Sequence, residues 1–346
     1  MKVLIIGSDS LHVKNYIDEL LNRKFDVYFI SDITSQFEFN VKVHNVSFKS
    51  KNPFVLLKNF FKLKSKIKAF SPDIVHIHQV NRLGFVAAKI ANSLKLPIVS
   101  TAWGSDVLVL PFKNFLYFQI SKYTLKYSNV VTADAQVMID SMRKIYPSST
   151  KYKLLQYGIE LVKPSTKENI IFSNRMHHSL YRIDAIILYF KEFVVEYPNW
   201  KLVIGGTGEE TIQYKKLVSD LNLESKVEFT NWLDLKQNHE WYSKSSIYIS
   251  IPITDGTSVS VLEAISAGCR VILSDLPVSH EWITDGVSGV IEKKGNNPFF
   301  EAMKLTNEQC YEYNLEKIKT LASREYCMTK FIEYYTVAKN KSNINL

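Results

Sequence analysis

Short apolar runs alternate with amphipathic stretches along most of this chain. Continuous apolar runs bounded by turn residues predict buried strands, and apolar residues three and four positions apart predict helices. We expect strands at residues 3–6, 27–30, 73–77, 97–101, 130–132, 170–173, 201–204, 227–229, 247–250 and 270–273. We expect helices at residues 11–22, 81–94 and 184–196, and from residue 306 onward. Because strands and helices alternate, the pattern predicts an α/β fold with parallel, doubly wound sheets.

The length of 346 residues suggests two domains, since one domain of average size is shorter. A turn-rich stretch, YGIELVKPST, separates the two series of strands and is interpreted as the linker. We therefore expect a first domain at residues 1–163, a second at 164–322, and a C-terminal helix at 323–346 that packs back toward the first. A cleft is expected between the two domains.

The net charge of +9 lies entirely in the first half of the chain. Residues 1–165 contain 23 Lys and Arg against 11 Asp and Glu, and residues 166–346 contain 20 against 23. A basic surface suits nucleic acid or an anionic membrane. Nothing in the sequence is typical of an RNA-reading module, so we expect no nucleic-acid partner.

The stretch from Lys49 to Lys68 carries seven lysines and no acidic residue. Leu56, Phe60, Leu63 and Ile67 keep helical spacing on one face, as in a basic amphipathic helix lying on an anionic membrane surface. The alternative is a helix packed on its own sheet with a solvated lysine face. Residues 112–127 also lack acids, and could equally belong to the core.

Cysteine usage and hydropathy bear on the compartment. The three cysteines show neither paired spacing nor a metal-ligand grouping, which favours a reducing compartment and no bound metal. The N-terminal apolar run is too short for a signal peptide, and no run reaches the length of a membrane span. We expect a cytoplasmic protein, peripheral at the inner face of the cytoplasmic membrane.

The segment DGTSVSVLEAISAG, residues 255–268, carries the strongest chemical signal. Asp255 and Glu263 stand eight positions apart, and Gly256, Thr257 and Ser258 form a small-residue loop that leads into a helix. The free N–H groups of such a helix start, together with the helix dipole, favour an anion without a metal. Glu263, about one turn inside the helix, could accept hydrogen bonds from a diol such as ribose. The alternative is an ordinary helix with Ser258 as its N-cap and Glu263 solvated.

Polar residues also follow other predicted strands, where ligands bind in doubly wound sheets. The first turn, GSDSLH, has one glycine and lacks the dinucleotide-binding pattern. The glycines of GGTGEE, among them Gly206, suit a tight strand-to-helix turn. Candidates to line a ligand site in the first half are His12, His78, Gln79, Trp103, Gly104, Ser105 and Asp106. A surface or capping role for His12 and a satisfied strand-end role for His78 remain open.

These segments together resemble a bacterial glycosyltransferase of family 4. The resemblance rests on SLHVKNYIDEL, DIVHIH, TAWGSDV, YGIEL, SNR with YRID, VIGGTGEE, and the block from SIYISIPITDGTSVSVLEAISAG to EWITDGVSGV. It implies the GT-B fold of two facing Rossmann-like domains, and a retaining transfer from a nucleotide-sugar donor.

The resemblance also implies roles for residues in the second domain. Glu263 matches the acid that binds ribose hydroxyls, Asp255 the acid near the transferred sugar, and Arg175 the arginine that pairs with the diphosphate. With these catalytic candidates, the implied donor site comprises Tyr181, Arg182, Gly206, Asn231, Trp232, Gly256, Thr257, Ser258 and Val259. The usual family lysine after Arg175 is absent: Arg182 could supply its charge, whereas Tyr181 could supply only a hydrogen bond. Asn231 and Trp232 fall where family members border the base.

Two departures from the family pattern are notable. The first acid is Asp255 rather than Glu, so its carboxylate reaches less far. Trp103 stands where many members have a histidine, and an indole cannot act as acid or base. The implied acceptor side comprises Ser10, His12, His78, Gln79, Trp103, Gly104, Ser105 and Asp106.

The predicted reaction moves a hexose-type sugar from a nucleotide diphosphate sugar to a hydroxyl of a glycan acceptor in surface polysaccharide assembly. We expect a lipid-linked rather than a soluble acceptor, an anionic membrane surface bound through the lysine-rich helix, and neither metal nor cofactor. The alternatives are a nucleotide-sugar 2-epimerase, a glycogen- or sucrose-type transferase acting on a soluble acceptor, and a non-catalytic sugar-binding or partner subunit.

Overall fold

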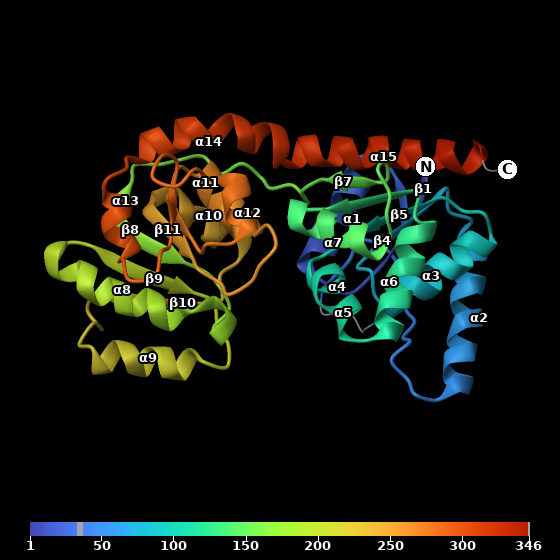
Figure 1. The fold of residues 1–346 in the computed structure, drawn as a ribbon, viewed down its shortest axis with the longest axis horizontal. Coiled ribbons are helices and arrows are strands. Elements are labelled where there is room, and N and C mark those ends of the chain that lie inside the picture. The colour runs from blue at the N-terminus through green and yellow to red at the C-terminus, as the bar shows by residue number, and fades with distance from the viewer. Residues whose placement is uncertain (33–36, 345–346) are drawn as a thin grey trace. The chain divides into compact units, whose positions relative to one another are not determined.

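The computed structural model describes residues 1–32 and 37–344, and the chain divides into two compact units. The first unit comprises Met1–Tyr157 together with Cys327–Leu346, and the second comprises Gly158–Tyr326. Each unit is built on one sheet whose paired strands are all parallel (Figure 1).

The first unit has a seven-stranded sheet in the order β3-β2-β1-β4-β5-β6-β7. Its strands are β1 (Lys2–Gly7), β2 (Asp26–Ser31), β3 (Val43–Asn45), β4 (Ile74–His78), β5 (Ile98–Thr101), β6 (Val130–Ala133) and β7 (Tyr152–Leu154). Its helices are α1 (Leu11–Asn22), α2 (Pro53–Phe70), α3 (Arg82–Ser93), α4 (Ser105–Leu108), α5 (Leu110–Lys113), α6 (Phe115–Tyr127), α7 (Gln136–Ile145) and most of α15 (Arg324–Ile344). Leu4, Ile6, Val75 and Ile77 from the central strands pack with Ala87 of α3 in the buried core.

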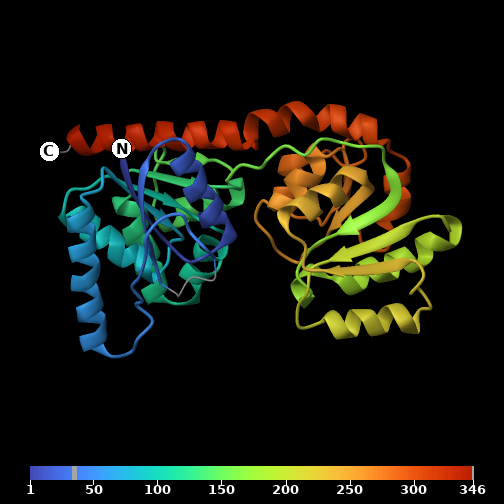
Figure 2. The ribbon, with the colours of Figure 1, turned by 180° about the vertical axis from the view of Figure 1, so that it is seen from behind.

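The second unit has a six-stranded sheet in the order β10-β9-β8-β11-β12-β13. Its strands are β8 (Glu168–Ser173), β9 (Lys201–Gly205), β10 (Val227–Asn231), β11 (Ser245–Ser250), β12 (Arg270–Leu273) and β13 (Val290–Ile291). Its helices are the 3-10 turn η1 (Ser179–Tyr181), α8 (Ile183–Glu196), α9 (Thr211–Asp220), α10 (Leu235–Lys244), α11 (Val259–Ser266), α12 (Pro277–Trp282), α13 (Pro298–Met303) and α14 (Asn307–Leu321). As Figure 2 shows from behind, helices cover both faces of this sheet.

Both sheets reverse their strand order beside their first strand. The reversal lies between β1 and β4 in the first unit and between β8 and β11 in the second, where Ile171 pairs with Ile247. In doubly wound sheets the loops at the carboxyl ends of these two strands form the ligand-binding edge. The predicted α/β class is confirmed, and the strand order identifies the loops at which a ligand site is expected.

The divisions between the units differ by a few residues from those expected. The first lies after Tyr157 rather than after residue 163, because the next residues bond to the second unit: Ile159 N–H donates to Ala322 O at 2.8 Å and Val162 N–H to Ser266 Oγ at 3.0 Å. The second lies after Tyr326 rather than after residue 322, since Arg324 N–H donates to Ile159 O at 2.8 Å.

The C-terminal helix α15 belongs to the first unit from Cys327 onward. The Tyr335 hydroxyl lies 2.7 Å from the Tyr16 hydroxyl and 2.8 Å from His76 Nδ1, and all three side chains are buried. Near its end, Lys339 forms an ion pair with Asp73 at 2.8 Å. These contacts tie the helix to α1 and β4.

Helix α2 has two apolar faces. Leu63 and Ile67 are fully buried, and Leu56 and Phe60 pack against the same core, so the apolar stripe expected on a membrane instead packs on the sheet. A different set of side chains projects on the opposite side of the helix. We name it the exposed α2 face: Phe54, Leu57, Lys58, Phe61 and Lys68.

Candidate functional site

The loops after β8 and β11 bring three predicted residues together. Arg175 follows β8, and its Nη2 lies 2.7 Å from Asp255 Oδ2 while its Nη1 donates to Ser258 Oγ. The guanidinium also lies over the Tyr181 ring, 4.4 Å from its centroid. Because β8 and β11 are neighbours, this cluster lies at the sheet edge where strand order reverses.

The electrostatics of the cluster favour a charged Arg175. Its side chain is 11% exposed and that of Asp255 is 25% exposed. Burial would lower the pKa of Arg175, but the Asp255 carboxylate, with Tyr248 and Tyr181, raises that pKa above its ordinary value. The arginine is therefore a permanent, oriented cation with forked donors, suited to a phosphate.

The loop before α11 differs in detail from the expected anion site. Asp255 Oδ1 accepts the Gly256 N–H at 3.0 Å, so this amide is occupied by the neighbouring carboxylate. Ser258 holds the N-cap position but caps no amide with its side chain, because its Oγ accepts from Arg175. The Val259 and Ser260 amides at the start of α11 still have no acceptor inside the helix, whereas Val261 N–H donates to Ser258 O at 3.1 Å. Positive potential at this point comes from Arg175 and the helix start together.

Glu263 lies one turn inside α11 and is 6% exposed, so the alternative of a solvated side chain is wrong. Its Oε1 lies 3.5 Å from Nε2 of His239, a residue of α10. Glu263 raises the pKa of His239, although burial opposes this. His239 is not among the residues predicted from the sequence, because a lone histidine in a polar helix gives no signal of its partner.

A buried tyrosine, Tyr248, senses the charges of these acids and of Arg175. The Tyr248 hydroxyl donates to Asn174 Oδ1 at 2.9 Å. Burial raises the pKa of Tyr248, the Arg175 charge opposes that rise, and the Glu263 and Asp255 charges add to it. All three predicted catalytic residues therefore act electrostatically on the same hydroxyl.

Tyr181 and Arg182, the two candidates to replace the family lysine, diverge. Tyr181 stays with Arg175 through its ring. Arg182 has left-handed backbone (φ 52°), and its two terminal nitrogens lie 2.7 and 2.8 Å from the carboxylate oxygens of Glu292. The Tyr189 hydroxyl donates to the same carboxylate at 2.7 Å. The structure therefore brings Tyr181, and not the charge of Arg182, to the Arg175 cluster.

The glycine turn after β9 borders Arg175. Gly206 has φ +99°, and a side chain there would place its Cβ 2.6 Å from the Arg175 carbonyl oxygen, so only glycine fits. Its N–H donates to Asn231 O at 2.7 Å. Asn231 ends β10 in left-handed conformation (φ 58°), and the following Trp232 is 70% exposed. Gly206, Asn231 and Arg175 are thus neighbours, with the Trp232 indole at the surface.

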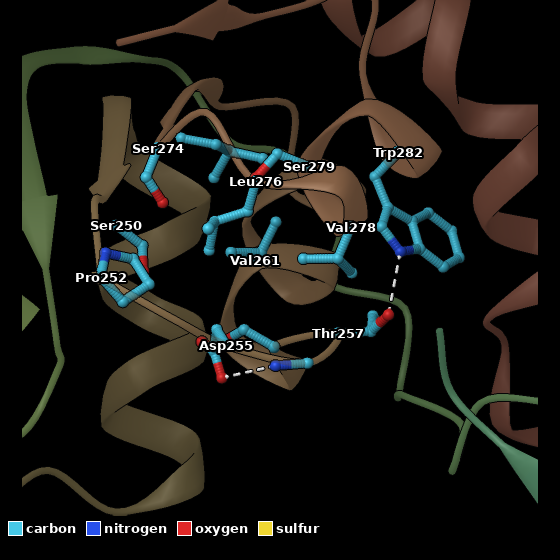
Figure 3. A pocket seen from close by; sticks show the side chains of 13 residues that line it. Ser250, Pro252, Asp255, Thr257, Val261, Ser274, Leu276, Val278, Ser279 and Trp282 are labelled. Atoms are coloured by element: carbon cyan, nitrogen blue, oxygen red, sulfur yellow. Dashed lines mark hydrogen bonds between the residues drawn. The ribbon is translucent and has the colours of Figure 1, made fainter. Parts of the chain in front are cut away.

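A small cavity lies beneath the loop that carries Asp255 (Figure 3). Its volume is about 20 Å³, room for about one water molecule. Apolar walls meet two buried hydroxyls, Ser250 and Ser274, whose Oγ atoms bond to no other described residue. At its rim the Trp282 indole N–H donates to Thr257 Oγ1 at 3.3 Å. The cavity can satisfy these hydroxyls only with a water or a small polar group.

The predicted acceptor-side residues follow β1, β4 and β5 of the first unit. Ser10 caps α1 by accepting Val13 N–H at 3.2 Å, and His12 is exposed in the first turn. The His12 ring centroid lies 5.7 Å from that of Tyr157 and 6.3 Å from that of Trp103. These aromatic side chains gather at one edge of the sheet.

His78 lies at the same edge but is buried. Its Nδ1 lies 3.3 Å from the Tyr157 hydroxyl, and its Nε2 bonds to no described residue. Burial, with the nearby His12, lowers the pKa of His78 to about 3, so the imidazole is neutral at physiological pH. Gln79 follows with φ +80° and accepts the Ser8 hydroxyl at 3.0 Å.

Asp106 shapes the backbone at this edge. Its carboxylate accepts Val80 N–H at 2.7 Å and Trp103 N–H at 2.9 Å. Burial raises the pKa of Asp106 while these N–H groups oppose the rise. Asp106 is therefore a positioning residue for the loops after β4 and β5. Gly104 has φ +114° and open space on its side-chain side, and Ser105 begins α4 exposed.

The described part of the chain offers neither a metal-ligand cluster nor a membrane-spanning helix. No group of three or more His, Cys, Asp or Glu within residues 1–32 and 37–344 could hold a metal ion. No helix in that same part of the chain has the length and apolar character needed to cross a bilayer.

Comparison with known proteins gives one family match in each unit. The family described as Glycosyl transferase 4-like matches residues 2–135, and the family described as Glycosyl transferases group 1 matches residues 159–302. An uncharacterized glycosyltransferase of Haemophilus influenzae is 26% identical over 345 residues, a match that covers 92% of each chain. An alpha-monoglucosyldiacylglycerol synthase of Streptococcus pneumoniae is 20% identical over 267 residues, which is 68% of this chain and 59% of that protein.

Solved structures agree on the fold. HepE of Anabaena, solved in complex with UDP, has a TM-score of 0.81 at 12% identity, covering 97% of this chain and 100% of that one. With the two parallel-sheet domains described above, this similarity confirms the predicted GT-B fold class.

Proposed function

We propose that this chain transfers a hexose-type sugar from a UDP-sugar to a glycan hydroxyl. The premise is that it belongs to the glycosyltransferases that combine a 4-like and a group 1 domain. The choice of uridine is supported by the UDP bound to HepE. The observation that carries the proposal is the cluster of Arg175, Asp255 and Ser258 beside Glu263.

The leaving group explains why this cluster would be needed. Breaking the bond between sugar and nucleotide places negative charge on the diphosphate. Arg175 and the first amides of α11 would lower the energy of that charge in a site largely closed to water. We propose that they do so without a divalent metal and that the sugar keeps its anomeric configuration. Asp255 would lie beside the transferred sugar, and Glu263 would accept the ribose hydroxyls.

A binding experiment tests the donor site. Melting temperatures of the full chain would be measured with UDP, GDP, ADP, CMP and their sugar conjugates, with and without EDTA, since a ligand of the native state raises that temperature. We expect an EDTA-insensitive shift with UDP and UDP-sugars that disappears in Arg175→Ala. A shift that requires a metal would contradict the metal-free proposal, and turnover-free binding of free sugars alone would favour a non-catalytic subunit.

We propose further that the acceptor is lipid-linked and reached from an anionic membrane surface. The exposed α2 face places three large apolar side chains among lysines: Phe54 is 80% exposed, Leu57 55% and Phe61 59%. Such a face can enter the headgroup region while its lysines pair with anionic lipids. The diacylglycerol in the name of the Streptococcus relative adds support.

Vesicle flotation tests this surface. The full chain should float with phosphatidylglycerol-containing vesicles at low salt, and less at high salt. The variant F54S/L57S/F61S should lose binding. A matched control, V195S/I212S, removes two apolar side chains that are 79% and 82% exposed in the second unit, and should still bind. Equal binding by both variants would contradict the proposed surface.

A further inference from the structure

The carboxylate of Glu263 is nearly buried but must keep free oxygen lone pairs if it is to bind a ligand. A buried carboxylate is costly unless paired, and a carboxylate that can rotate loses part of its ability to hold a diol. Glu263 is 6% exposed on α11, which packs beside α10. The side chain that pairs with it therefore controls its orientation.

His239 is the side chain placed to do this. Its Nε2 lies 3.5 Å from Glu263 Oε1, with the imidazole side chain 22% exposed and the carboxylate 8%. At this distance the contact is an ion pair rather than a formed hydrogen bond, and the buried nitrogen has no hydrogen-bond partner among the described residues. Helix α10 is held at its start by a reciprocal cap in which Asp234 accepts Gln237 N–H at 2.8 Å and the Gln237 side chain accepts Asp234 N–H at 2.9 Å. The histidine thus projects from a fixed helix.

Two further charges face the imidazole from the neighbouring segments. Glu160, before β8, and Arg324, at the start of α15, form an ion pair at 3.3 Å. Glu263 and Glu160 favour the imidazolium and Arg324 disfavours it, while burial also opposes the charge. The pKa of His239 is raised in sum, with its interaction with Glu263 as the largest cause.

We propose that His239 is a positioning residue that holds the Glu263 carboxylate for the ribose hydroxyls of the donor. This inference rests on the proposed function, because Glu263 is taken there as the ribose acceptor. A carboxylate offers about four lone-pair sites. Once the contact shortens, the imidazole would occupy one on Oε1 and leave the others for two vicinal hydroxyls. The distance of 3.5 Å is long and should shorten when the diol binds.

The pairing also predicts a pH dependence with a defined sign. Below its pKa, His239 carries a charge that attracts the Glu263 carboxylate and fixes its orientation. Above it, a neutral imidazole can still donate from Nε2 but exerts a weaker pull. Donor affinity should therefore fall as pH rises through the raised pKa of His239.

The test is calorimetry on the full chain with two probes, UDP and 2′-deoxy-UDP. His239→Ala should weaken UDP about tenfold, the loss of roughly one charged hydrogen bond. It should weaken 2′-deoxy-UDP much less, because that ligand lacks one hydroxyl that Glu263 would hold. His239→Gln keeps an N–H donor, so it should retain most UDP affinity and lose the pH dependence that appears above the ordinary histidine pKa. The control His280→Ala removes an exposed histidine of α12 and should change neither.

Three results decide between the possibilities. A larger loss for UDP than for 2′-deoxy-UDP, with rescue by glutamine, supports the positioning role. Equal losses for both probes would overturn it, since His239 would then act only on packing. If the unmodified chain binds neither probe, the proposed donor site itself fails, an outcome distinct from the previous one.

Discussion

Replacing Arg175 with alanine removes three contacts at once: the ion pair with Asp255, the hydrogen bond to Ser258 and the stacking on Tyr181. If Arg175 stabilises the departing diphosphate, its loss should lower kcat/KM by about 10²–10³, or about 2.7–4 kcal/mol, as for other preorganised donors. Arg175→Lys keeps a charge but not the fork, and its kcat/KM should fall between those of the parent and Arg175→Ala.

The same change should also reduce stability, for a separate reason. Asp255 is 25% exposed, so removing its partner leaves a partly desolvated carboxylate. We expect a cost of about 1–3 kcal/mol, reduced toward the lower figure by the remaining solvent contact. Adding Asp255→Asn removes the uncompensated charge. The double variant should regain most of the stability lost in Arg175→Ala without regaining activity.

Two assays separate these effects. Denaturant unfolding gives the free energy of unfolding for the parent and the three variants, and release of UDP from UDP-sugar in the presence of acceptor gives kcat/KM. If the kcat/KM of Arg175→Ala stays within about threefold of the parent's, far from the expected decrease of about 10²–10³, the role given to Arg175 is refuted. Recovery of activity together with stability in the double variant would refute it as well.

Three further changes test other parts of the structure. Arg182→Ala leaves Glu292 without its bidentate partner and should lower the free energy of unfolding by about 1–3 kcal/mol, measured with denaturant. It should change kcat/KM far less than Arg175→Ala does. A catalytic loss as large as that of Arg175→Ala would indicate that Arg182 contacts the diphosphate. Gly206→Ala forces a Cβ against the Arg175 carbonyl at positive φ, and should lower the melting temperature and weaken nucleotide binding together; normal values of both would contradict the close approach. The pKa of His78 falls from the ordinary 6.5 to about 3 in the folded protein. Between these values the unfolded chain binds a proton at His78 and the folded protein does not, so the stability should decrease as the pH falls below 6.5. His78→Gln should flatten this loss between about pH 6.5 and 4, and an unchanged slope in unfolding experiments would contradict the buried neutral imidazole.

The strands of both sheets could be predicted from the sequence because most of them are buried on both faces. In a chain of alternating elements, a continuous apolar run as short as residues 3–6 fits a buried strand and is too short for a helix. The short edge strands β3, β7 and β13 were not predicted, since segments of two or three residues show no pattern that distinguishes them from a loop. The basic stretch at 112–127 is interrupted at Asn114, which ends α5 and caps α6 by accepting Tyr117 N–H at 3.0 Å.

Site residues on loops after neighbouring strands were predictable, whereas side-chain pairings were not. The family resemblance placed Arg175 and Asp255 in one donor site, and the structure shows that they follow β8 and β11, the neighbouring strands at the point of reversed order. The pairing of Arg182 with Glu292 joins residues 110 positions apart, and that of His239 with Glu263 depends on how two helices pack. Periodicity specifies a buried face but not the partner across it.

Helix α2 illustrates the same limit. Its regular apolar stripe, Leu56 to Ile67, is the face that packs on the sheet, as the periodicity alone would indicate. The exposed apolar residues lie on the lysine side, where sequence spacing gave no separate signal. Only the burial of the side chains distinguishes the two faces. The proposed membrane contact is therefore assigned to the exposed α2 face and not to the stripe from Leu56 to Ile67.

The most direct test of the proposed donor site is UDP binding by the full chain in EDTA, compared between the parent, Arg175→Ala and Glu263→Ala by calorimetry. We predict binding by the parent without metal and a loss of at least about tenfold in each variant, since each removes a charged contact to the nucleotide. Binding of equal strength in all three proteins would contradict a donor site built on Arg175 and Glu263.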